Sequence, residues 1–359
     1  MHMADALLSP AVGVTLWAAS GLTLGWCSKQ LRTDPRDHLV PLMGVLGAFI
    51  FAAQMINFSI PGTGSSGHIG GGLLLSILLG GPAAFVVLAS VLTVQALFFA
   101  DGGLLALGAN IFNLGVLPCF IAYPLIYRPL LKRAGSAPSK NRLTMISVLA
   151  AVVSMQMGAL GVVLETQLSG ISSLPLATFL WVMQPIHLAI GLVEGLATAA
   201  VIAFIRQARP DLLHASAPAP STMAAATRFP TRVIVSLGCA ALLTGGVFSW
   251  FASSSPDGLE WSIARVTGQP KLASAASSIH KAFAQLQQRI APVPDYKFTA
   301  LENNAPVPAG GKSGGQQAWP AIDAQTSLAG VLGGVGTLVI VVAIGFFLRP
   351  RRARELPHT

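Results

Sequence analysis

Long apolar runs alternate with short polar or basic loops along most of the chain. A helix needs about 20 mostly apolar residues to cross a bilayer, and most of these runs approach that length. The pattern therefore predicts an all-α, polytopic membrane protein in which a seven-helix bundle is followed by two further transmembrane helices. We expect the seven spans at 7–27, 41–57, 69–79, 83–99, 104–127, 143–164 and 176–205, and the last two at 232–251 and 328–348.

The third apolar run is shorter than the others and follows a stretch rich in glycine and serine, residues 59–68. This composition predicts irregular backbone near the membrane face. Such backbone is tolerated at membrane depth only where protein buries it or where it lines a cavity. Gly80, Gly81 and Pro82 are expected to break the chain before the next span.

Basic residues gather in a few loops, and these loops predict the orientation of the protein in the membrane. They follow the first, fifth, seventh and ninth spans, which places these loops and the C-terminus in the cytoplasm and the N-terminus outside. No basic segment precedes the first apolar run near Leu7, so we expect no secretory signal peptide. On this topology His2 and His68 lie on the same outer face of a plasma membrane.

The composition of the chain also favours a membrane protein. Of the 359 residues, 53% are hydrophobic and 10% are charged, whereas an average soluble domain is roughly 25% charged. The net charge of +9 does not indicate nucleic acid, because the basic residues form short clusters between apolar runs. The three cysteines, Cys27, Cys119 and Cys239, have no zinc-site spacing and are expected to be small buried side chains.

Residues 208–231 are rich in alanine, proline, serine and threonine, which is typical of a linker. We therefore expect two parts, residues 1–207 and residues 232–359. The polar stretch 252–326 lies outside the membrane on the predicted topology. Within it, residues 273–290 have the pattern of an amphipathic helix.

The first two residues place several nitrogen donors side by side. The Met1 amine, the His2 backbone nitrogen and the His2 imidazole can turn toward one ion, and such donors suit nickel, copper, cobalt and zinc. His68, flanked by glycines, is on the same predicted face and would be a fourth donor. The alternative is that residues 1–2 are a frayed terminus.

Other polar side chains lie within the predicted spans. His187 and Glu194 share a face of the seventh span, and ionisable residues inside a membrane are usually functional. The alternative is a buried pair that locks helices together. Asn57 and Gln95 either bridge helices by hydrogen bonds or support metal ligands.

Two further motifs point to other activities. Residues 310–314 have the sequence Gly-Gly-Lys-Ser-Gly, the end of a phosphate loop, but Pro306 stands where that motif needs its first glycine. Residues 64–67 match G-x-S-G, and His187 begins H-x-x-x-G-x-x-x-G. Ser66 with His187 thus resembles the dyad of rhomboid intramembrane serine proteases, although no H-x-x-x-N sequence is present.

Five segments taken together resemble the substrate-capture component of cobalt/nickel energy-coupling factor transporters. They are 1–5 (MHMAD), 51–58, 66–72 (SGHIGGG), 95–110 and 187–196. The resemblance implies that Met1, His2 and His68 hold a nickel(II) or cobalt(II) ion that is cargo, and that the protein has no cofactor of its own. The residues expected around these ligands are Asp5, Asn57, Ser66, Gln95, His187 and Glu194. Ala6 departs from the glycine that the family often has.

Residues 232–348 resemble the small two-span accessory subunit of the same systems, whose signature P-D-G-L-E stands at 256–260. Without the resemblance, Pro256 and Asp257 also fit a simple turn. The resemblance implies a prokaryotic transporter subunit, not an enzyme. Its partners would be a transmembrane coupling subunit and cytoplasmic ATPase subunits that hydrolyse ATP for it.

Overall fold

The computed structural model describes residues 2–34, 36, 39–135, 138–208, 231–272, 277–298 and 319–348. These residues are mostly helical, which confirms the all-α, polytopic class. Within them, six helices are long and apolar enough to cross a membrane. They are α1 (Pro10–Leu31), α4 (Gly81–Phe98), the continuous helix Leu107–Arg133, α7 (Lys140–Ser169), α8 (Leu176–Ala208) and α14 (Ala324–Leu348).

Three predicted spans are shorter than expected. Helices α2 (Leu39–Gln54) and α10 (Thr231–Gly246) have 16 residues each, or about 24 Å at the α-helical rise. The α10 helix is followed by the short 3-10 helix η3 (Phe248–Phe251). Helix α3 (Gly72–Leu79) has only 8 residues, all buried, and at about 12 Å it does not cross a bilayer alone.

The first helix begins three residues later than predicted. Ser9 caps α1 by accepting a hydrogen bond from the Val12 amide at 3.4 Å, and Pro10 fits the first helical position because its missing N–H would be unpaired there. The residues before it form a short 3-10 helix, η1 (Asp5–Leu7), so the chain reaches α1 as a buried arm.

The loop predicted to be irregular contains a small antiparallel hairpin, with β1 (Phe58–Ile60) paired to β2 (Ser65–Gly67). Gly62 and Gly64 make the turn at φ values of 76° and 73°, a conformation that glycine adopts without steric cost. The hairpin delivers His68 directly after β2.

The continuous helix Leu107–Arg133 consists of α5 (Leu107–Ile111), a π-helical stretch η2 (Phe112–Tyr127) and α6 (Arg128–Arg133). Pro118 and Pro124 lie inside the π-helical stretch, where each removes a backbone donor. It packs against α3, α4 and α7.

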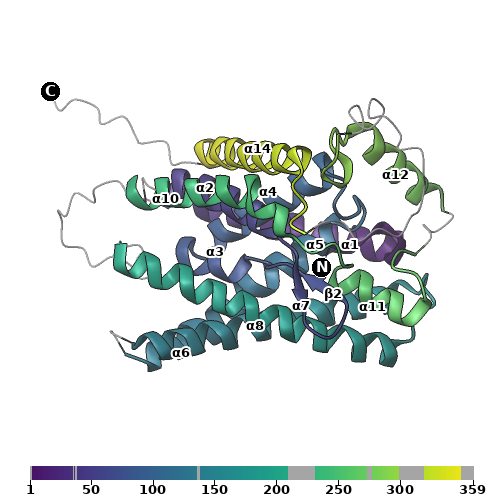
Figure 1. The fold of residues 1–359 in the computed structure, drawn as a ribbon, viewed down its shortest axis with the longest axis horizontal. Helices are drawn as coiled ribbons and strands as arrows, with labels where there is room; N and C mark the ends of the chain where they lie inside the picture. The colour runs from purple at the N-terminus through teal and green to yellow at the C-terminus, as the bar shows by residue number, and fades with distance from the viewer. Residues whose placement is uncertain are drawn as a thin grey trace.

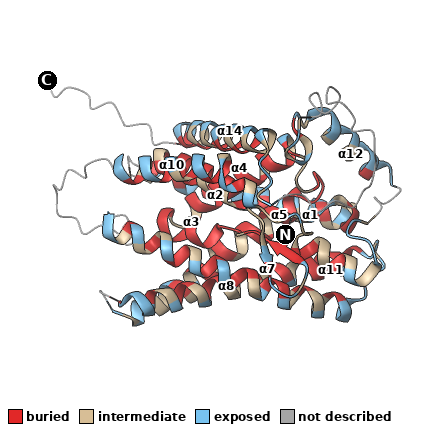
Figure 2. Cartoon of the chain, in the orientation of Figure 1, coloured by how far each residue is buried: buried red, intermediate tan, exposed pale blue. Residues whose placement is uncertain are grey.

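The long helices run side by side, and α11 (Gly258–Thr267) and α12 (Ser278–Ile290) lie near the opposite end of the bundle from α6 (Figure 1). Helix α7 packs along α8, and α14 packs against α2, α10 and α4. Buried residues concentrate where these helices face one another, and exposed residues lie on the outer faces of the bundle (Figure 2). Cys27 and Cys119 are buried as expected, but Cys239 is exposed on α10, so that part of the cysteine prediction is wrong.

Candidate metal-binding site

Hydrogen bonds made by its own backbone hold the arm formed by residues 2–8 inside the bundle. The Met3 amide donates to Asn110 Oδ1 at 2.7 Å, and the Gly103 amide donates to the Met3 carbonyl at 3.0 Å. Met3, Leu7 and Leu8 are buried in the hydrophobic core. The arm is therefore an ordered segment from residue 2 onward, while Met1 lies outside the described residues.

Asp5 secures the same arm to the turn before α5. Its Oδ1 accepts a hydrogen bond from the Ala106 amide at 2.9 Å. Burial raises the pKa of the Asp5 carboxyl, and hydrogen bonds from neighbouring amides offset part of this effect. Asp5 lines the cavity described below, but its carboxylate binds backbone, so it acts as an anchor for the arm.

The His2 and His68 rings stack on each other, with their centroids 5.1 Å apart and an interplanar angle of 21°. His2 Nδ1 lies 2.9 Å from Asp101 Oδ1, and His2 Nε2 is buried without a hydrogen-bond partner among the described residues. Burial lowers the pKa of His68 to about 3. The His68 ring is therefore neutral at pH 7 and keeps a lone pair for an ion.

The carboxylate of Glu194 fixes the backbone that follows His68. Glu194 Oε2 accepts from the Gly70 amide and Oε1 from the Gly71 amide, each at 3.0 Å. Gln54 Nε2 donates to the Gly70 carbonyl at 2.8 Å. Gln95 Nε2 in turn donates to Gln54 Oε1 at 2.8 Å. Glu194 and Gln95 therefore act on the loop that carries the second imidazole.

The P-D-G-L-E segment lies against the hairpin that carries His68. The Ser66 amide donates to the Pro256 carbonyl at 2.8 Å, and Ser66 pairs with Asp257 as an isolated parallel bridge. Asp257 caps α11 by accepting from the Glu260 amide at 2.8 Å. Burial raises the pKa of Asp257, and the hydrogen bond from the Glu260 amide acts in the opposite direction.

Ser66 and His187 do not form the dyad of the protease alternative. The Ser66 hydroxyl donates to the Ser255 carbonyl at 2.7 Å, and His187 Nδ1 donates to the Met183 carbonyl at 2.7 Å. A Cβ added to Gly258 would lie 3.2 Å from His187 Cε1, so α8 and α11 pack closely at this ring. The His187 ring therefore packs against Gly258 of the P-D-G-L-E segment.

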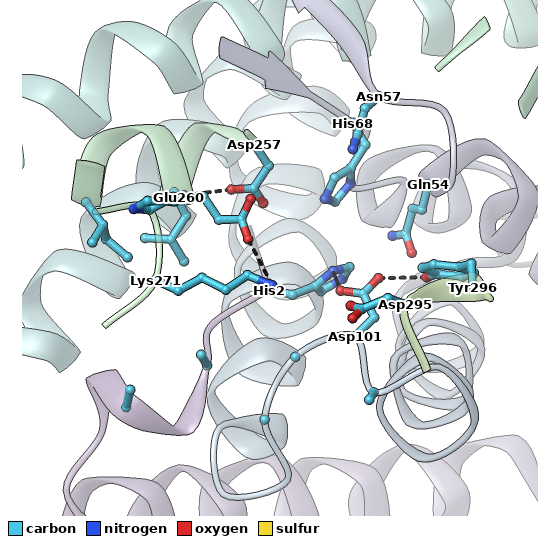
Figure 3. Close-up of a pocket in the computed structure, with 18 of the residues that line it drawn as sticks. His2, Gln54, Asn57, His68, Asp101, Asp257, Glu260, Lys271, Asp295 and Tyr296 are labelled. Carbon is cyan, nitrogen blue, oxygen red and sulfur yellow. Dashed lines mark hydrogen bonds and ion pairs between the residues drawn. The ribbon is translucent and has the colours of Figure 1, made fainter. Parts of the chain in front are cut away.

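The two imidazoles open into a cavity of about 610 Å³ that both halves of the chain line. Figure 3 shows His2 and His68 pointing toward each other, with Asp257 on the side of His68 and Asp101 beside His2. Asn57 lines the cavity too, and its buried Oδ1 has no hydrogen-bond partner among the described residues. Those residues contain no group of three His, Cys, Asp or Glu side chains arranged to hold a metal.

Two residues of the site, Asp101 and Tyr296, are not predicted by the sequence. Asp101 stands in segment 95–110 and next to two glycines, which is a usable signal for a turn at a site. Tyr296 lies in η4 (Pro294–Tyr296), and its hydroxyl donates to Asp101 Oδ2 at 2.7 Å. No local pattern in the sequence pairs these two residues, which are 195 positions apart.

Comparison with known proteins places this geometry in a family. The family model described as the cobalt uptake substrate-specific transmembrane region matches residues 2–212, and the PDGLE domain matches residues 231–350. The fused nickel transport protein NikMN of Rhodobacter capsulatus is 29% identical over 329 residues, which are 86% of this chain and 91% of that protein.

Two further relatives match the first part. The cobalt transport protein CbiM of Sorangium cellulosum is 31% identical over 59% of this chain and 94% of its own. A crystal structure of a transition metal transporter is 30% identical, with a TM-score of 0.51 over 60% of this chain and 96% of that one. These matches give no support to the protease alternative. The chain therefore belongs to the cobalt uptake substrate-specific transmembrane family, fused in one multi-pass membrane protein to a PDGLE domain.

Proposed function

We propose that this protein captures a nickel(II) or cobalt(II) ion outside the membrane and imports it as the substrate-binding part of an energy-coupling factor transporter. The observation that carries the proposal is the close pair of imidazole rings, His2 and His68, at a cavity lined by both halves of the chain. Imidazole nitrogens suit either metal, and the relatives are named as nickel and cobalt transport proteins.

The proposed donors are the Met1 amine, the His2 amide and imidazole nitrogens, and the His68 imidazole. The three donors of residues 1–2 close fused chelate rings on one ion, so the entropy of gathering separate ligands is spared. Parallel stacked rings do not aim their lone pairs at one point. Both imidazoles must therefore turn to bind one ion together.

We also propose the division of the chain, its orientation and its partners. Residues 1–207 form the capture part, 208–231 the linker and 232–359 the accessory part. The basic helix α6 and the helices α11 and α12 lie at opposite ends of the bundle (Figure 1), which fits a cytoplasmic α6 and an outer cavity. A membrane coupling subunit and ATPase subunits would drive import.

Paired substitutions in the purified full chain test the capture site. His68→Ala should abolish tight nickel and cobalt binding, because it removes a ligand. Ser66→Ala should leave the affinity nearly unchanged, because it removes only the hydrogen bonds of the hydroxyl to the Ser255 and Pro256 carbonyls. Wild-type affinity in His68→Ala would refute the ligand set, whichever metal is used.

Uptake of radioactive nickel into cells tests the partners. Cells that produce this chain with the coupling and ATPase subunits should accumulate the ion in proportion to the chain's metal affinity. An ATPase subunit without its catalytic lysine should stop accumulation and leave binding by the purified chain unchanged. Equal uptake with the inactive ATPase would contradict the energy-coupling proposal.

A further inference from the structure

The P-D-G-L-E segment brings a carboxylate of the PDGLE part to the imidazole of His68. Ser66 and Asp257 pair as a parallel bridge, and the Ser66 amide donates to the Pro256 carbonyl at 2.8 Å. Asp257 and His68 line the cavity of about 610 Å³ together, and both also line a second, smaller cavity. Figure 3 shows the Asp257 carboxylate on the side of His68. The charge of this carboxylate acts on both imidazoles of the pair.

The position of Asp257 is fixed by the elements around it. Its Oδ1 accepts a hydrogen bond from the Glu260 amide at 2.8 Å and so caps α11. Trp261 on the same helix donates from Nε1 to the carbonyl of Thr63, in the turn of the hairpin, at 2.9 Å. Helix α11 also packs against α8. The carboxylate is therefore held at one place relative to the hairpin that carries His68.

The proposed ligand set leaves a net charge on the bound ion. The amine and the two imidazoles are neutral when they bind, and the amide nitrogen of His2 binds after it loses its proton. A divalent ion with these donors therefore carries one net positive charge. Only 7% of the His2 side chain and 8% of residue His68 are exposed, so little water screens this charge. A charge that leaves water without a partner is costly.

Asp257 differs from the other carboxylates near the two imidazoles. Asp5 and Glu194 accept hydrogen bonds from backbone amides and hold the arm and the loop. Asp101 contacts the Tyr296 hydroxyl and the imidazole of the arm. Asp257 comes from the other half of the chain and lies beside the imidazole that the hairpin carries.

We propose that the Asp257 carboxylate balances the charge of the ion bound by Met1, His2 and His68, and that it does so without replacing any of the four nitrogen donors. The PDGLE part thereby supplies a charge to a site whose proposed ligands all belong to the first part of the chain. This inference rests on the proposed function. It gives the aspartate of the P-D-G-L-E signature a role in metal binding in addition to the cap of α11.

The test uses the purified full chain in detergent, titrated with nickel chloride. Asp257→Asn removes the charge, and asparagine caps a helix about as well as aspartate does. Nickel affinity should fall about 10- to 100-fold, the range for loss of a group that supports a metal site from outside its ligands. The thermal midpoint of the metal-free protein should stay the same. The visible absorption band of bound nickel should not move, because the four nitrogen donors are unchanged.

Glu260→Gln is the matched control. It removes a carboxylate of the same signature that lines the same cavity. The Glu260 side chain is more exposed, and its Oε1 lies 3.8 Å from Lys271 Nζ. Because exposed and paired charges contribute little, its loss should change nickel affinity by no more than about twofold. An equal loss of affinity in both variants would overturn the inference, since the position of Asp257 would then have no special effect.

The outcomes distinguish this inference from the proposed function. Wild-type affinity in Asp257→Asn, alongside lost binding in His68→Ala, would overturn the inference and leave the proposed function intact. Wild-type binding in both variants would overturn both. A shifted band in Asp257→Asn would make Asp257 a ligand, and a lower thermal midpoint would make its effect structural; either result overturns the inference. If Asp257→Asn does not fold, Asp257→Ser keeps a capping oxygen without the charge, and unchanged affinity in that variant overturns the inference.

Discussion

The carboxylates near the two imidazoles differ in what they bind. Glu194 and Asp5 accept hydrogen bonds from backbone amides, so each fixes a segment that carries a proposed ligand. Asp101 instead contacts an imidazole. Substitution of these residues should therefore affect metal binding in different ways.

Glu194→Gln should weaken both the His68 loop and metal binding. A neutral amide cannot accept two charge-assisted hydrogen bonds from Gly70 and Gly71, and leaving one buried amide unpaired costs about 1–3 kcal/mol. We expect a lower thermal midpoint and a nickel affinity reduced by about tenfold, measured on the purified chain. Glu165→Gln is the control, because this buried glutamate contacts Asn113 and not the His68 loop; equal losses in both variants would contradict the prediction.

The site residues that can be predicted from sequence are those with local signals. His2 follows the first residue, and His68 lies among glycines, so the sequence itself marks both as candidate ligands. Asp101 and Tyr296 pair through folding of distant segments, and although the glycines after Asp101 indicate a turn, no pattern in the sequence joins it to Tyr296. The hydrogen bonds of Asp5 and Glu194 to backbone amides likewise depend on tertiary contacts.

At the scale of elements, helix α12 of the PDGLE part covers the N-terminal arm. His280 Nε2 donates to the Leu8 carbonyl at 2.9 Å and to the Asp5 carbonyl at 3.1 Å. Gln287 Nε2 donates to the Gly102 carbonyl at 2.8 Å. The arm and the turn that carries Asp101 are thus held by the same outer helix.

His280→Ala should loosen the arm without removing a ligand. The Leu8 carbonyl loses its His280 donor and the Asp5 carbonyl keeps only the Leu8 amide, so amide hydrogen exchange of residues 3–8 should accelerate and nickel affinity should fall, while the stoichiometry stays unchanged. Lys281→Ala, at an exposed neighbouring position on α12, should change neither quantity. Loss of stoichiometric binding in His280→Ala would instead indicate that His280 is a ligand.

Helix α14 packs on α2 through small residues, as membrane helices commonly do. A Cβ at Gly333 would overlap the Phe51 ring, whereas a Cβ at Gly336 would meet no described atom within 4 Å. Gly333→Ala should therefore lower stability by about 1–3 kcal/mol through overpacking. Thermal unfolding in detergent measures this, and Gly336→Ala should be neutral or stabilising; the same loss in both would contradict the described packing.

The elements that the sequence predicts well are the long apolar helices, because length and hydropathy alone determine them. The hairpin β1–β2 is not predicted, since its strands have three residues each and depend on glycine turns and on the P-D-G-L-E segment. Helix α3 is buried on all sides, so its apolar run resembles a span although it has 8 residues.

At the scale of the whole molecule, the part that matches the cobalt uptake family and the PDGLE part share one cavity and one set of packed helices. Helices α10 and α14 pack on α2, while η4 and α11 reach the turn of Asp101 and the hairpin of His68. The fusion therefore places both parts around the proposed metal site.

In the proposed function, the amine of Met1 binds the ion together with His2 and His68. The most direct measurement compares nickel affinity for two full-length proteins, one with a single glycine added before Met1 and one with a glycine added after Thr359. An added residue turns the amine into an amide and puts bulk beside a buried arm. We predict that the N-extended protein loses tight binding and that the C-extended protein keeps it. Equal affinities would contradict the account, because the amine of Met1 would not be a ligand.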